Sequence, residues 1–442
     1  MRESKENEMK NDSLVLQTDS YKVSHWKQFP PGTEKAYYYI ESRGGSKELK
    51  FFGLQAILKD ILSDVPTVEQ VEFADKFWTA HGEPFNKEGW LKIVELGYYP
   101  LEIRAVKEGS ICTPRQVLST IVNTNPEFFW LAGWVETRIL QLWYPTTVCT
   151  KSWKCKKVIQ KYLESTGDVA GLDFKLHDFG YRGVSSQGSA EMGGMAHLVN
   201  FMGTDTIAGV FAAQEYYNTD EMVAFSIPAA EHSTMTSWGK DDEEGAYKNM
   251  LDQFAKPGSI VAVVSDSYDL ENAVNKYWGG TLKQQVLGSG ATIVVRPDSG
   301  EPWKIVLRTV DQLAKLFGYE VNDKGYKVLN PAVRVIQGDG IDDENSINKI
   351  LKELTDFGYS ADNVAFGMGG GLLQQVNRDT LKFAMKCSAI KQNGEWKDVF
   401  KCPVDAKWKA SRGGRFNDNT LDLVWKDGKF IKEYTFEEVR NN

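Results

Sequence analysis

From about residue 170 onward, short runs of β-branched and other apolar residues alternate with longer stretches that have helical spacing. The expected strands are 172–177, 223–227, 259–265, 292–295, 333–336 and 363–366, and the expected helices are 190–201, 243–255, 270–278, 303–317 and 345–357. Parallel strands need a crossover connection, so this alternation predicts a parallel sheet with helices outside. The number of repeats favours closure into an irregular TIM-like α/β barrel.

The two ends of the chain have a different pattern. Run 35–41 is strand-like, stretch 54–62 is helical, and apolar segment 128–143 is predicted to be a buried helix. Asn393-Gly394 and Asp427-Gly428 each separate two β-rich runs, which is typical of type I′ hairpins. We therefore expect residues 14–150 and 388–442 to form a second, α+β accessory and dimerisation domain built from both chain ends. Residues 151–387 would form the barrel, and residues 1–13 a disordered tail.

Composition narrows the class of protein. Apolar residues make up 42% and charged residues 25% of the 442 residues, as in a globular protein. The net charge of −8 argues against nucleic acid as a partner, so a polyanionic ligand needs a local cationic cluster. The N-terminus lacks an apolar signal region and no 18-residue apolar run exists, so we expect a cytoplasmic protein with no membrane partner. The five cysteines show no CxxC spacing, and no zinc site is expected.

Seven polar motifs follow the expected strands. They are 177–183 (HDFGYRG), 203–206 (GTDT), 228–234 (PAAEHST), 265–269 (SDSYD), 296–300 (RPDSG), 337–340 (QGDG) and 367–371 (GMGGG). In a barrel, the carboxyl ends of all the strands lie on one face, where such enzymes place their active sites. The sequence therefore predicts that these seven motifs meet at one site.

Two glycine-rich motifs indicate a phosphate site. Gly369 and Gly370, like Gly338 before Asp339, let the backbone approach an anion closely, and late barrel loops are the usual phosphate site. A tight turn is the alternative explanation. Neither the Walker pattern nor the GxGxxG fingerprint is present, which disfavours a nucleoside-triphosphate switch and a nicotinamide-dinucleotide oxidoreductase.

The charged residues of these motifs could bind a ligand or a metal ion. Asp266, Asp298 and Asp339 could bind ribose hydroxyls or hold Mg²⁺ through water, or they could merely cap the following helices. Arg182 and Arg296 supply planar cationic forks for phosphate oxygens, although either could be a structural ion pair. Among the five histidines, His232 alone lies between strand-end motifs with a carboxylate, Glu231, directly before it in such a motif. That placement favours a functional histidine over a core histidine.

These motifs, in this order, resemble the nicotinamide phosphoribosyltransferases, which are type II phosphoribosyltransferases with nicotinate and quinolinate relatives. The resemblance extends from Thr18-Asp19-Ser20-Tyr21-Lys22-Val23 to Lys386-Cys387-Ser388 and covers essentially the whole chain. It implies transfer of the 5-phosphoribosyl group from phosphoribosyl pyrophosphate to nicotinamide, which gives nicotinamide mononucleotide and pyrophosphate for NAD salvage.

The resemblance also implies a role for each matched residue. Phe179, with Tyr21 of the partner subunit, would stack on the nicotinamide ring, and Asp205 would accept a hydrogen bond from its carboxamide. Arg182 and Arg296 would hold the carboxamide oxygen or phosphates. Asp298 would hold ribose hydroxyls, and the 5′-phosphate would lie against a cradle made of Gly338, Asp339, Gly369 and Gly370. A flat pyridine ring gains from such aromatic stacking.

Catalysis in this family implies further partners. His232, beside Glu231, matches a histidine that is phosphorylated by ATP, the activating co-substrate. Mg²⁺ would arrive with the substrate pyrophosphate, without a protein metal site. A homodimer with shared active sites is implied, in which Asp19, Arg43, Arg378 and Lys386 face the phosphates from the partner subunit.

Three rival functions are compatible with parts of this pattern, of which the third, a non-catalytic binding protein on the same scaffold, is disfavoured by the intact motifs. A nicotinate phosphoribosyltransferase shares the fold and the chemistry, but Asp205 would repel the acid substituent of nicotinate. An unrelated barrel enzyme for phosphosugars, such as an aldolase, would explain the glycine motifs but not the pair of aromatic residues, Tyr21 and Phe179. We see no lysine at a strand end for Schiff-base chemistry.

Overall fold

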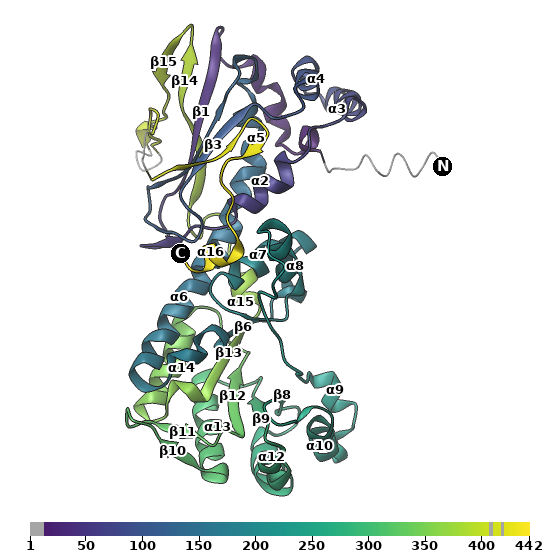
Figure 1. Cartoon of the computed structure of the whole chain (residues 1–442), viewed down its shortest axis with the longest axis vertical. Helices are drawn as coiled ribbons and strands as arrows, with labels where there is room; N and C mark the ends of the chain where they lie inside the picture. Colours follow the sequence, from purple (N-terminus) through teal and green to yellow (C-terminus); the bar gives the residue numbers. More distant parts are fainter. Residues whose placement is uncertain (1–12, 406–409, 417–419) are drawn as a thin grey trace, which may run out of the picture. The chain divides into compact units, whose positions relative to one another are not determined.

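The structure is a computed structural model that describes residues 13–405, 410–416 and 420–442 (Figure 1). Apart from Ser13, the tail expected at residues 1–13 lies outside the described residues. Contacts divide the chain into two compact units. The first unit contains the residues up to Thr147, Gln214–Thr219 and Asn377–Asn442, and the second contains Val148–Ala213 and Asp220–Val376.

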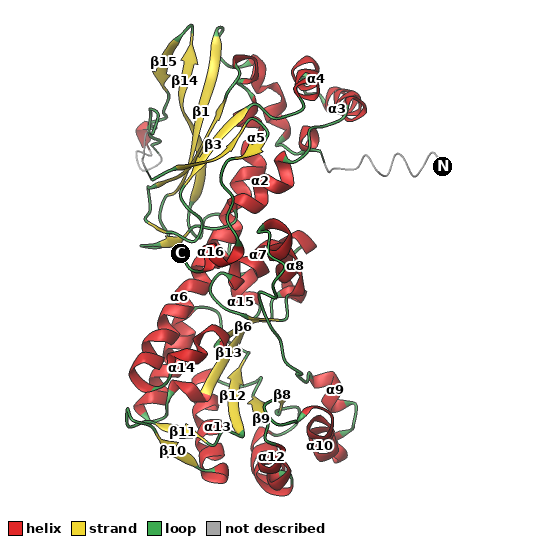
Figure 2. Cartoon of the chain, viewed as in Figure 1, coloured by secondary structure: helices red, strands yellow, loops and turns green. Residues whose placement is uncertain are grey.

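The second unit is built on a parallel sheet with helices around it, as Figure 2 shows. Its strands, in the spatial order β7-β6-β13-β12-β9-β8, are β7 (Gly203–Thr204), β6 (Leu176–Asp178), β13 (Val364–Met368), β12 (Val333–Gln337), β9 (Thr292–Arg296) and β8 (Ile260–Val264). Every neighbouring pair is parallel. Most residues of the middle strands are buried, and Val335 and Phe366 are fully so, as expected for a sheet covered on both faces.

An irregular segment connects the two edges of this sheet. Phe225 forms a parallel bridge with Gly203 of β7, and Ala229 forms one with Ala262 of β8. The strand expected at 223–227 was therefore wrong: only single-residue bridges form, since Pro228 has no N–H to donate to a ladder. The segment still gives the sheet the irregular, barrel-like closure expected from the sequence.

The helices of the second unit follow the strands in alternation. They are most of α6 (Trp143–Thr166), η5 (Val169–Phe174), η6 (Tyr181–Gly183), α7 (Gln187–Leu198), most of α8 (Ile207–Tyr216), α9 (His232–Thr236), η7 (Lys240–Asp242), α10 (Glu243–Phe254), α11 (Leu270–Asn272), η8 (Ala273–Thr281), α12 (Lys283–Ser289), α13 (Pro302–Phe317), α14 (Glu344–Asp356), η9 (Ala361–Asn363) and α15 (Gly370–Leu373). A two-stranded sheet, β10 (Tyr319–Val321) with β11 (Lys327–Leu329), follows α13. The run 172–177, expected to be one strand, is divided between η5 and β6, and the helix expected at 270–278 is mostly the π-helix η8.

The first unit contains a seven-stranded antiparallel sheet, visible at the top of Figure 2. Its strands, in spatial order, are β15 (Glu395–Asp398), β14 (Phe383–Gln392), β1 (Thr33–Ser42), β5 (Val117–Asn123), β3 (Leu101–Ala105), β16 (Asp422–Lys426) and β17 (Lys429–Phe430). Both predicted hairpins are present, because Asn393, Gly394, Asp427 and Gly428 all have the positive φ that type I′ turns require. Residues from both chain ends thus share one sheet.

Helices pack on this sheet, with α5 in contact with β1 and β5. The remaining elements of the unit are η1 (Leu14–Leu16), η2 (Ser20–Lys27), α2 (Leu54–Leu62), α3 (Val68–His81), α4 (Lys87–Leu96), η3 (Pro126–Phe128), α5 (Leu131–Ile139), η4 (Leu140–Leu142) and α16 (Phe436–Arg440), with the pair β2 (Leu49–Lys50) and β4 (Ile111–Cys112). The segment 128–143, expected to be one helix, is broken into η3, α5 and η4 before α6 (Trp143–Thr166) begins.

A short central segment also belongs to the first unit. It is the end of α8 (Ile207–Tyr216) with the residues after it. The Tyr217 hydroxyl donates to the buried Glu108 carboxylate at 2.5 Å, and Gln55 donates to the Tyr216 carbonyl at 2.8 Å. These buried bonds explain why the segment packs with the sheet of that unit. Within the described residues, no helix is both long and apolar enough to cross a membrane.

Candidate active site

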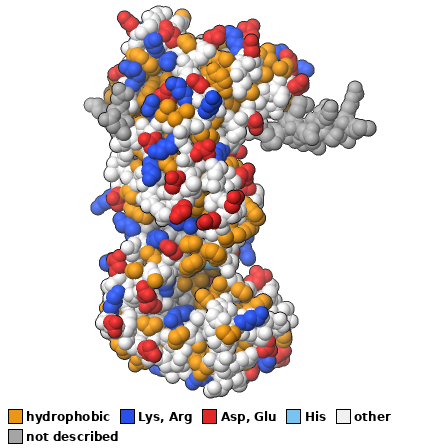
Figure 3. Space-filling view, viewed as in Figure 1, with side chains coloured by type: hydrophobic (Ala, Val, Ile, Leu, Met, Phe, Trp, Pro, Cys, Tyr) orange, Lys and Arg blue, Asp and Glu red, His pale blue; other side chains and the backbone are white. Residues whose placement is uncertain are grey.

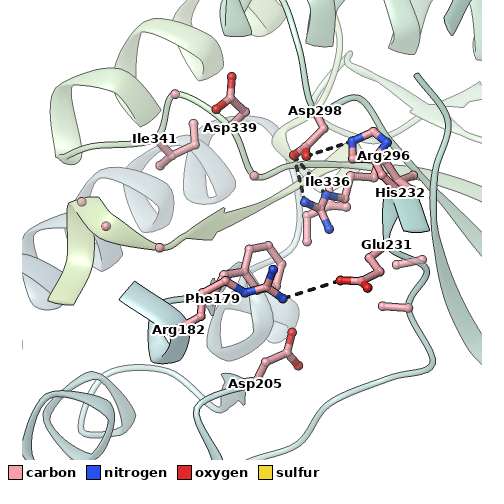
Figure 4. A pocket seen from close by; sticks show the side chains of 18 of the residues that line it. Phe179, Arg182, Asp205, Glu231, His232, Arg296, Asp298, Ile336, Asp339 and Ile341 are labelled. Atoms are coloured by element: carbon pink, nitrogen blue, oxygen red, sulfur yellow. Dashed lines mark hydrogen bonds and ion pairs between the residues drawn. The ribbon is translucent and has the colours of Figure 1, made fainter. Parts of the chain in front are cut away.

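The carboxyl ends of the parallel strands surround a pocket of about 800 Å³ in the second unit (Figure 4). Its wall includes residues from six of the seven predicted motifs: Phe179, Tyr181, Arg182, Asp205, Ala229, Glu231, His232, Ser233, Arg296, Asp298, Gly338, Asp339, Gly340, Gly369, Gly370 and Gly371. The seventh motif, 265–269, does not line the pocket, but its Asp266 and Ser267 contact the lining residues Asp298 and His232. The structure therefore brings six of the seven motifs together in one pocket.

Phe179 lies at the end of β6, with its ring inside the pocket. The ring packs so closely on the backbone of Gly367 that a Cβ there would lie 1.9 Å from Phe179 Cε2. The Arg296 guanidinium lies over the ring, with Cζ 5.4 Å from the ring centroid, a cation–π distance. Gly367 thus lets an aromatic ring lie flat against the strand end, with Arg296 on its face.

Asp205, after β7, faces the same part of the pocket. Its Oδ1 accepts hydrogen bonds from His177 Nε2 at 3.0 Å and from Ser226 Oγ at 2.6 Å. Burial is the largest influence on the pKa of Asp205 and acts to raise it, but the His177 and Ser226 bonds and the Arg296 charge together outweigh it and lower the pKa. Asp205 is therefore an ionised acceptor beside the Phe179 ring.

Arg296 and two aspartates form a connected group on the next strands. Arg296 donates to Asp298 Oδ1 from Nη2 at 2.9 Å and from Nε at 3.3 Å. Asp266, whose side chain is only 4% exposed, accepts at Oδ2 from the Asp298 backbone N–H at 2.8 Å and from the Ser299 hydroxyl at 2.6 Å. Its other oxygen, Oδ1, is buried without a hydrogen-bond partner in the described part of the chain.

His232 begins α9 and lies beside this group. Its Nδ1 is 3.1 Å from Ser267 Oγ, and its Nε2 is 3.4 Å from Asp298 Oδ2 and 3.8 Å from Asp266 Oδ1. Almost half of its side chain, 47%, is exposed. The geometry presents an accessible imidazole with carboxylates near one nitrogen and a hydroxyl near the other.

Glu231 and Arg182 lie on the rim of the pocket. Glu231 is the N-cap residue of α9, and its carboxylate is 3.7 Å from Arg182 Nη2 (Figure 4). The bond from the Ser233 hydroxyl, followed by the Arg182 charge, lowers the pKa of Glu231. Arg182 itself is 86% exposed, so its guanidinium is free to move toward a ligand.

The glycine-rich loops after β12 and β13 form the opposite end of the pocket. They touch so closely that a Cβ on Gly371 would lie 2.7 Å from Asp342 Cα. Lys151 of α6 donates from Nζ to the Gly371 carbonyl and fixes the loop from below. Backbone N–H groups at such a turn into a helix are suited to an anion.

The predicted partner-subunit cluster lies in a separate cavity of about 930 Å³ in the first unit. Its wall contains Asp19, Tyr21, Arg43, Arg115, Glu136, Arg378, Asp379, Lys382, Lys386 and Lys401. Glu41, fully buried, orients Arg43 and Arg115 at 2.9 and 3.1 Å. Burial lowers the pKa of Lys386, as do neighbouring Arg43 and Lys401, against the charge of Glu136.

The structure also identifies site residues that the sequence did not single out. His177 and Ser226 hold Asp205, Ser267 contacts His232, and Lys151 holds the phosphate-end loop. His177 and Ser267 stand inside two of the predicted motifs, which is the signal that could have found them. Lys151 and Ser226 have no such signal, because each acts through a contact distant in sequence.

Fold and pocket together define an α/β-barrel protein with a pocket at the strand ends, which is where barrel enzymes place their active sites. Two family models match the chain: the nicotinate phosphoribosyltransferase family over residues 174–428, and the N-terminal domain of nicotinamide phosphoribosyltransferase over residues 13–103. The chain therefore belongs to the nicotinate phosphoribosyltransferase family, which is a family of pentosyltransferases.

Individual proteins give the same result. The nicotinamide phosphoribosyltransferase of Xanthomonas campestris pv. campestris (strain 8004) is 49% identical, in an alignment that covers 97% of each chain. Two solved structures share the fold at 15% identity: nicotinate-nucleotide pyrophosphorylase from Pyrococcus furiosus, with a TM-score of 0.58 over 97% of this chain and 93% of that one, and human nicotinic acid phosphoribosyltransferase, with 0.55 over 96% and 92%.

Proposed function

We propose that the protein transfers the 5-phosphoribosyl group of phosphoribosyl pyrophosphate to nicotinamide, giving nicotinamide mononucleotide and pyrophosphate for NAD salvage. One observation carries the choice of substrate: an ionised Asp205 that lines the pocket beside the Phe179 ring. A carboxylate accepts a hydrogen bond from a ring carboxamide but repels a ring carboxylate. The 49% identical relative is named for the same substrate.

The mechanism is a displacement at the anomeric carbon of the ribose. A bond forms from the pyridine nitrogen to that carbon while its bond to the pyrophosphate oxygen breaks, and the electron pair leaves with the pyrophosphate. The attacking nitrogen carries no proton, so no general base is needed. The protein aligns the two substrates and stabilises charge in the transition state.

Each end of the pocket fits one part of these substrates. The ring would lie on Phe179, with Arg182 or Arg296 near the carboxamide oxygen or a phosphate. The 5′-phosphate would lie against Gly338, Asp339, Gly369 and Gly370, where the two close-packed loops turn. Asp298, beside Arg296, would hold the ribose hydroxyls.

Magnesium would enter as part of the pyrophosphate substrate. Asp266 fits this ion, because its Oδ1 is buried and lacks a hydrogen-bond partner within the described residues, and Asp298 is bonded to its other oxygen. Carboxylate oxygens are the ligands Mg²⁺ prefers, often through water. The ion would neutralise charge on the leaving pyrophosphate.

His232 is the proposed site of phosphorylation by ATP. An imidazole nitrogen would attack the γ-phosphorus, the bond to the β–γ bridging oxygen would break, and ADP would leave. The exposed ring, its contact with Ser267 and its nearness to Asp298 support this role. Phosphorylated His232 would place negative charge near the ribose carbon that becomes cationic in the transition state, and ATP hydrolysis would be coupled to tighter substrate binding. Glu231 would fix the start of α9.

A homodimer would complete each active site. The partner subunit's Tyr21 would cover the second face of the nicotinamide ring, and the cationic cavity of the partner would face the phosphates. Tyr21 is 59% exposed, as such a role requires. Some apolar side chains of the second unit are exposed, including Phe211 at 64% and Met222 at 55%, and a second copy of the chain would cover such side chains. Figure 3 shows hydrophobic side chains among charged ones on the face viewed.

The test is a steady-state assay of purified protein with phosphoribosyl pyrophosphate, Mg²⁺ and either nicotinamide or nicotinate, with and without ATP. We expect the mononucleotide of nicotinamide to form preferentially, and Asp205→Ser to shift preference toward nicotinate by about a hundredfold. Preference of the native protein for nicotinate would refute the assignment of substrate. Full ATP stimulation in His232→Ala would refute the role of that histidine.

A further inference from the structure

We infer that His177 and Ser226 are positioning residues that make the pocket select a ring amide over a ring acid. They act through Asp205, which they hold in one orientation from two different segments of the chain. This inference rests on the proposed function, because it assigns the selectivity of that same pocket to residues that do not touch the ring.

Both hydrogen bonds to the Asp205 side chain end on the same oxygen. His177 Nε2 lies 3.0 Å and Ser226 Oγ 2.6 Å from Oδ1, and these are the only hydrogen bonds of that carboxylate within the described part of the chain. Oδ2 therefore keeps its lone pairs for a ligand, and almost half of the side chain, 48%, is exposed. The arrangement distinguishes the two oxygens: one is bound to protein and the other is offered to the pocket.

The chemistry of the carboxylate assigns the protons. An ionised carboxylate only accepts hydrogen bonds, so His177 Nε2 must carry hydrogen and Ser226 must donate its hydroxyl proton. Without these donors, a partly buried Asp205 would bind a proton more readily, since burial opposes its charge. A protonated Asp205 could donate to nicotinate, and the discrimination would fall.

Packing keeps His177 in place. It lies on β6 opposite Gly203 of β7, and a Cβ on Gly203 would come within 2.8 Å of His177 Nδ1. Its ring is 5.0 Å from the ring of Phe179, and its side chain is only 15% exposed. The imidazole that orients the carboxylate is thus packed against the ring platform, which fixes the amide site relative to the stacking site.

His177→Leu removes the donor but keeps an apolar side chain of similar size. We expect KM for nicotinamide to rise about tenfold with kcat within about twofold, because one hydrogen bond to a charged group is lost. We expect the ratio of kcat/KM for nicotinamide to that for nicotinate to fall about thirtyfold, and to fall further at lower pH. His177→Gln, whose amide N–H can donate, should recover most of the ratio, and Ser226→Ala should lower it about threefold.

The readouts separate positioning from general damage. Where nicotinate is turned over too slowly, its competitive inhibition constant against nicotinamide replaces kcat/KM. His81→Leu, an exposed histidine outside the pocket, is the matched control and should leave the ratio unchanged. If His177→Leu does not fold, Ser226→Ala and His177→Gln test the same oxygen.

Two outcomes would overturn the inference. The first is an unchanged amide-to-acid ratio in His177→Leu and Ser226→Ala. The second is an equal loss on both substrates that His177→Gln does not recover. Failure of the proposed function would look different, because the native protein itself would then prefer nicotinate or make no nicotinamide mononucleotide, before any variant is compared.

Discussion

The two cavities described above differ in charge and in how they are built. The cavity of the second unit combines carboxylates with Arg182, Arg296 and His232 at the ends of short parallel strands. The cavity of the first unit collects six cationic side chains against three carboxylates: Arg43, Arg115, Arg378, Lys382, Lys386 and Lys401 against Asp19, Glu136 and Asp379. The cavity of the second unit suits a neutral ring and a sugar phosphate. The cavity of the first unit suits a polyphosphate.

This difference indicates a division of work between the units. In the second unit, the ion pair Arg296–Asp298 neutralises part of the charge, so we expect a ligand there to be recognised by shape and by single hydrogen bonds. In the first unit, uncompensated positive charge provides attraction that depends on salt. Substitutions in the second unit should therefore act on the ring substrate and on the chemical step, while substitutions in the first should act on phosphate affinity.

The largest effect should come from Arg296→Ala. This change removes the two bonds to Asp298 and the cation over Phe179. We expect kcat/KM to fall about a thousandfold, because a preorganised charged donor to the carboxamide oxygen or a phosphate is lost. Arg296→Lys, which keeps the charge without the planar fork, should recover only a part. Steady-state kinetics measure this, with exposed Arg308→Ala on α13 as control, and a loss below tenfold would contradict it.

Phe179→Ala should have the next largest effect. Loss of the stacking surface should lower kcat/KM for nicotinamide about thirtyfold, mostly through KM, since stacking on an aromatic side chain contributes roughly 1–3 kcal/mol. Phe179→Tyr keeps the ring and should stay near native. Affinity for phosphoribosyl pyrophosphate, measured by isothermal titration, should change little in either variant. An equal loss of both substrates would show that the ring supports the whole pocket instead.

The sequence predicted turns and most strands correctly where local chemistry decides the structure. Asn393-Gly394 and Asp427-Gly428 specify their turns directly through positive φ. Buried strands such as Val261–Val264 are recognised by their β-branched content. The convergence of the motifs follows from topology alone, because parallel strands bring all their carboxyl ends to one face.

The rest depends on contacts that a single sequence does not reveal. The 223–227 run has the apolar content of a strand, but its neighbours offer only isolated bridges. The 214–219 segment joins the first unit through Tyr217 and the buried Glu108, which lie 109 positions apart. The hydrogen bond from Ser226 to Asp205 likewise depends on the position of an irregular loop, which the sequence around Ser226 does not specify.

A moderate effect is expected from Arg378→Ala in the first unit. Arg378 lines the cationic cavity and is 58% exposed, so its loss should raise KM for phosphoribosyl pyrophosphate or for ATP about tenfold while KM for nicotinamide stays constant. The difference should shrink as salt is raised from 0.05 to about 0.5 M, because exposed charges are screened. Arg415→Ala, outside the cavity wall, is the control. A salt-independent change would contradict the electrostatic account.

The smallest effect on turnover is expected from Asp178→Asn, at the buried end of β6 directly before Phe179. Burial raises the pKa of Asp178 to about 6, against the bond from the Gly180 N–H. The folded protein thus holds this proton more tightly than the unfolded chain, so Asp178 stabilises the fold less as pH rises from about 4 to about 6. The loss in the free energy of unfolding should approach 3 kcal/mol, at about 1.4 kcal/mol per pKa unit.

Urea denaturation of the native protein and of Asp178→Asn from pH 4 to 8 measures this loss. The variant should gain stability relative to the native protein as pH rises from about 4 to about 6, and no further above pH 6. A gap that does not change with pH would mean that Asp178 titrates normally, and that the strand end beneath Phe179 tolerates a charge.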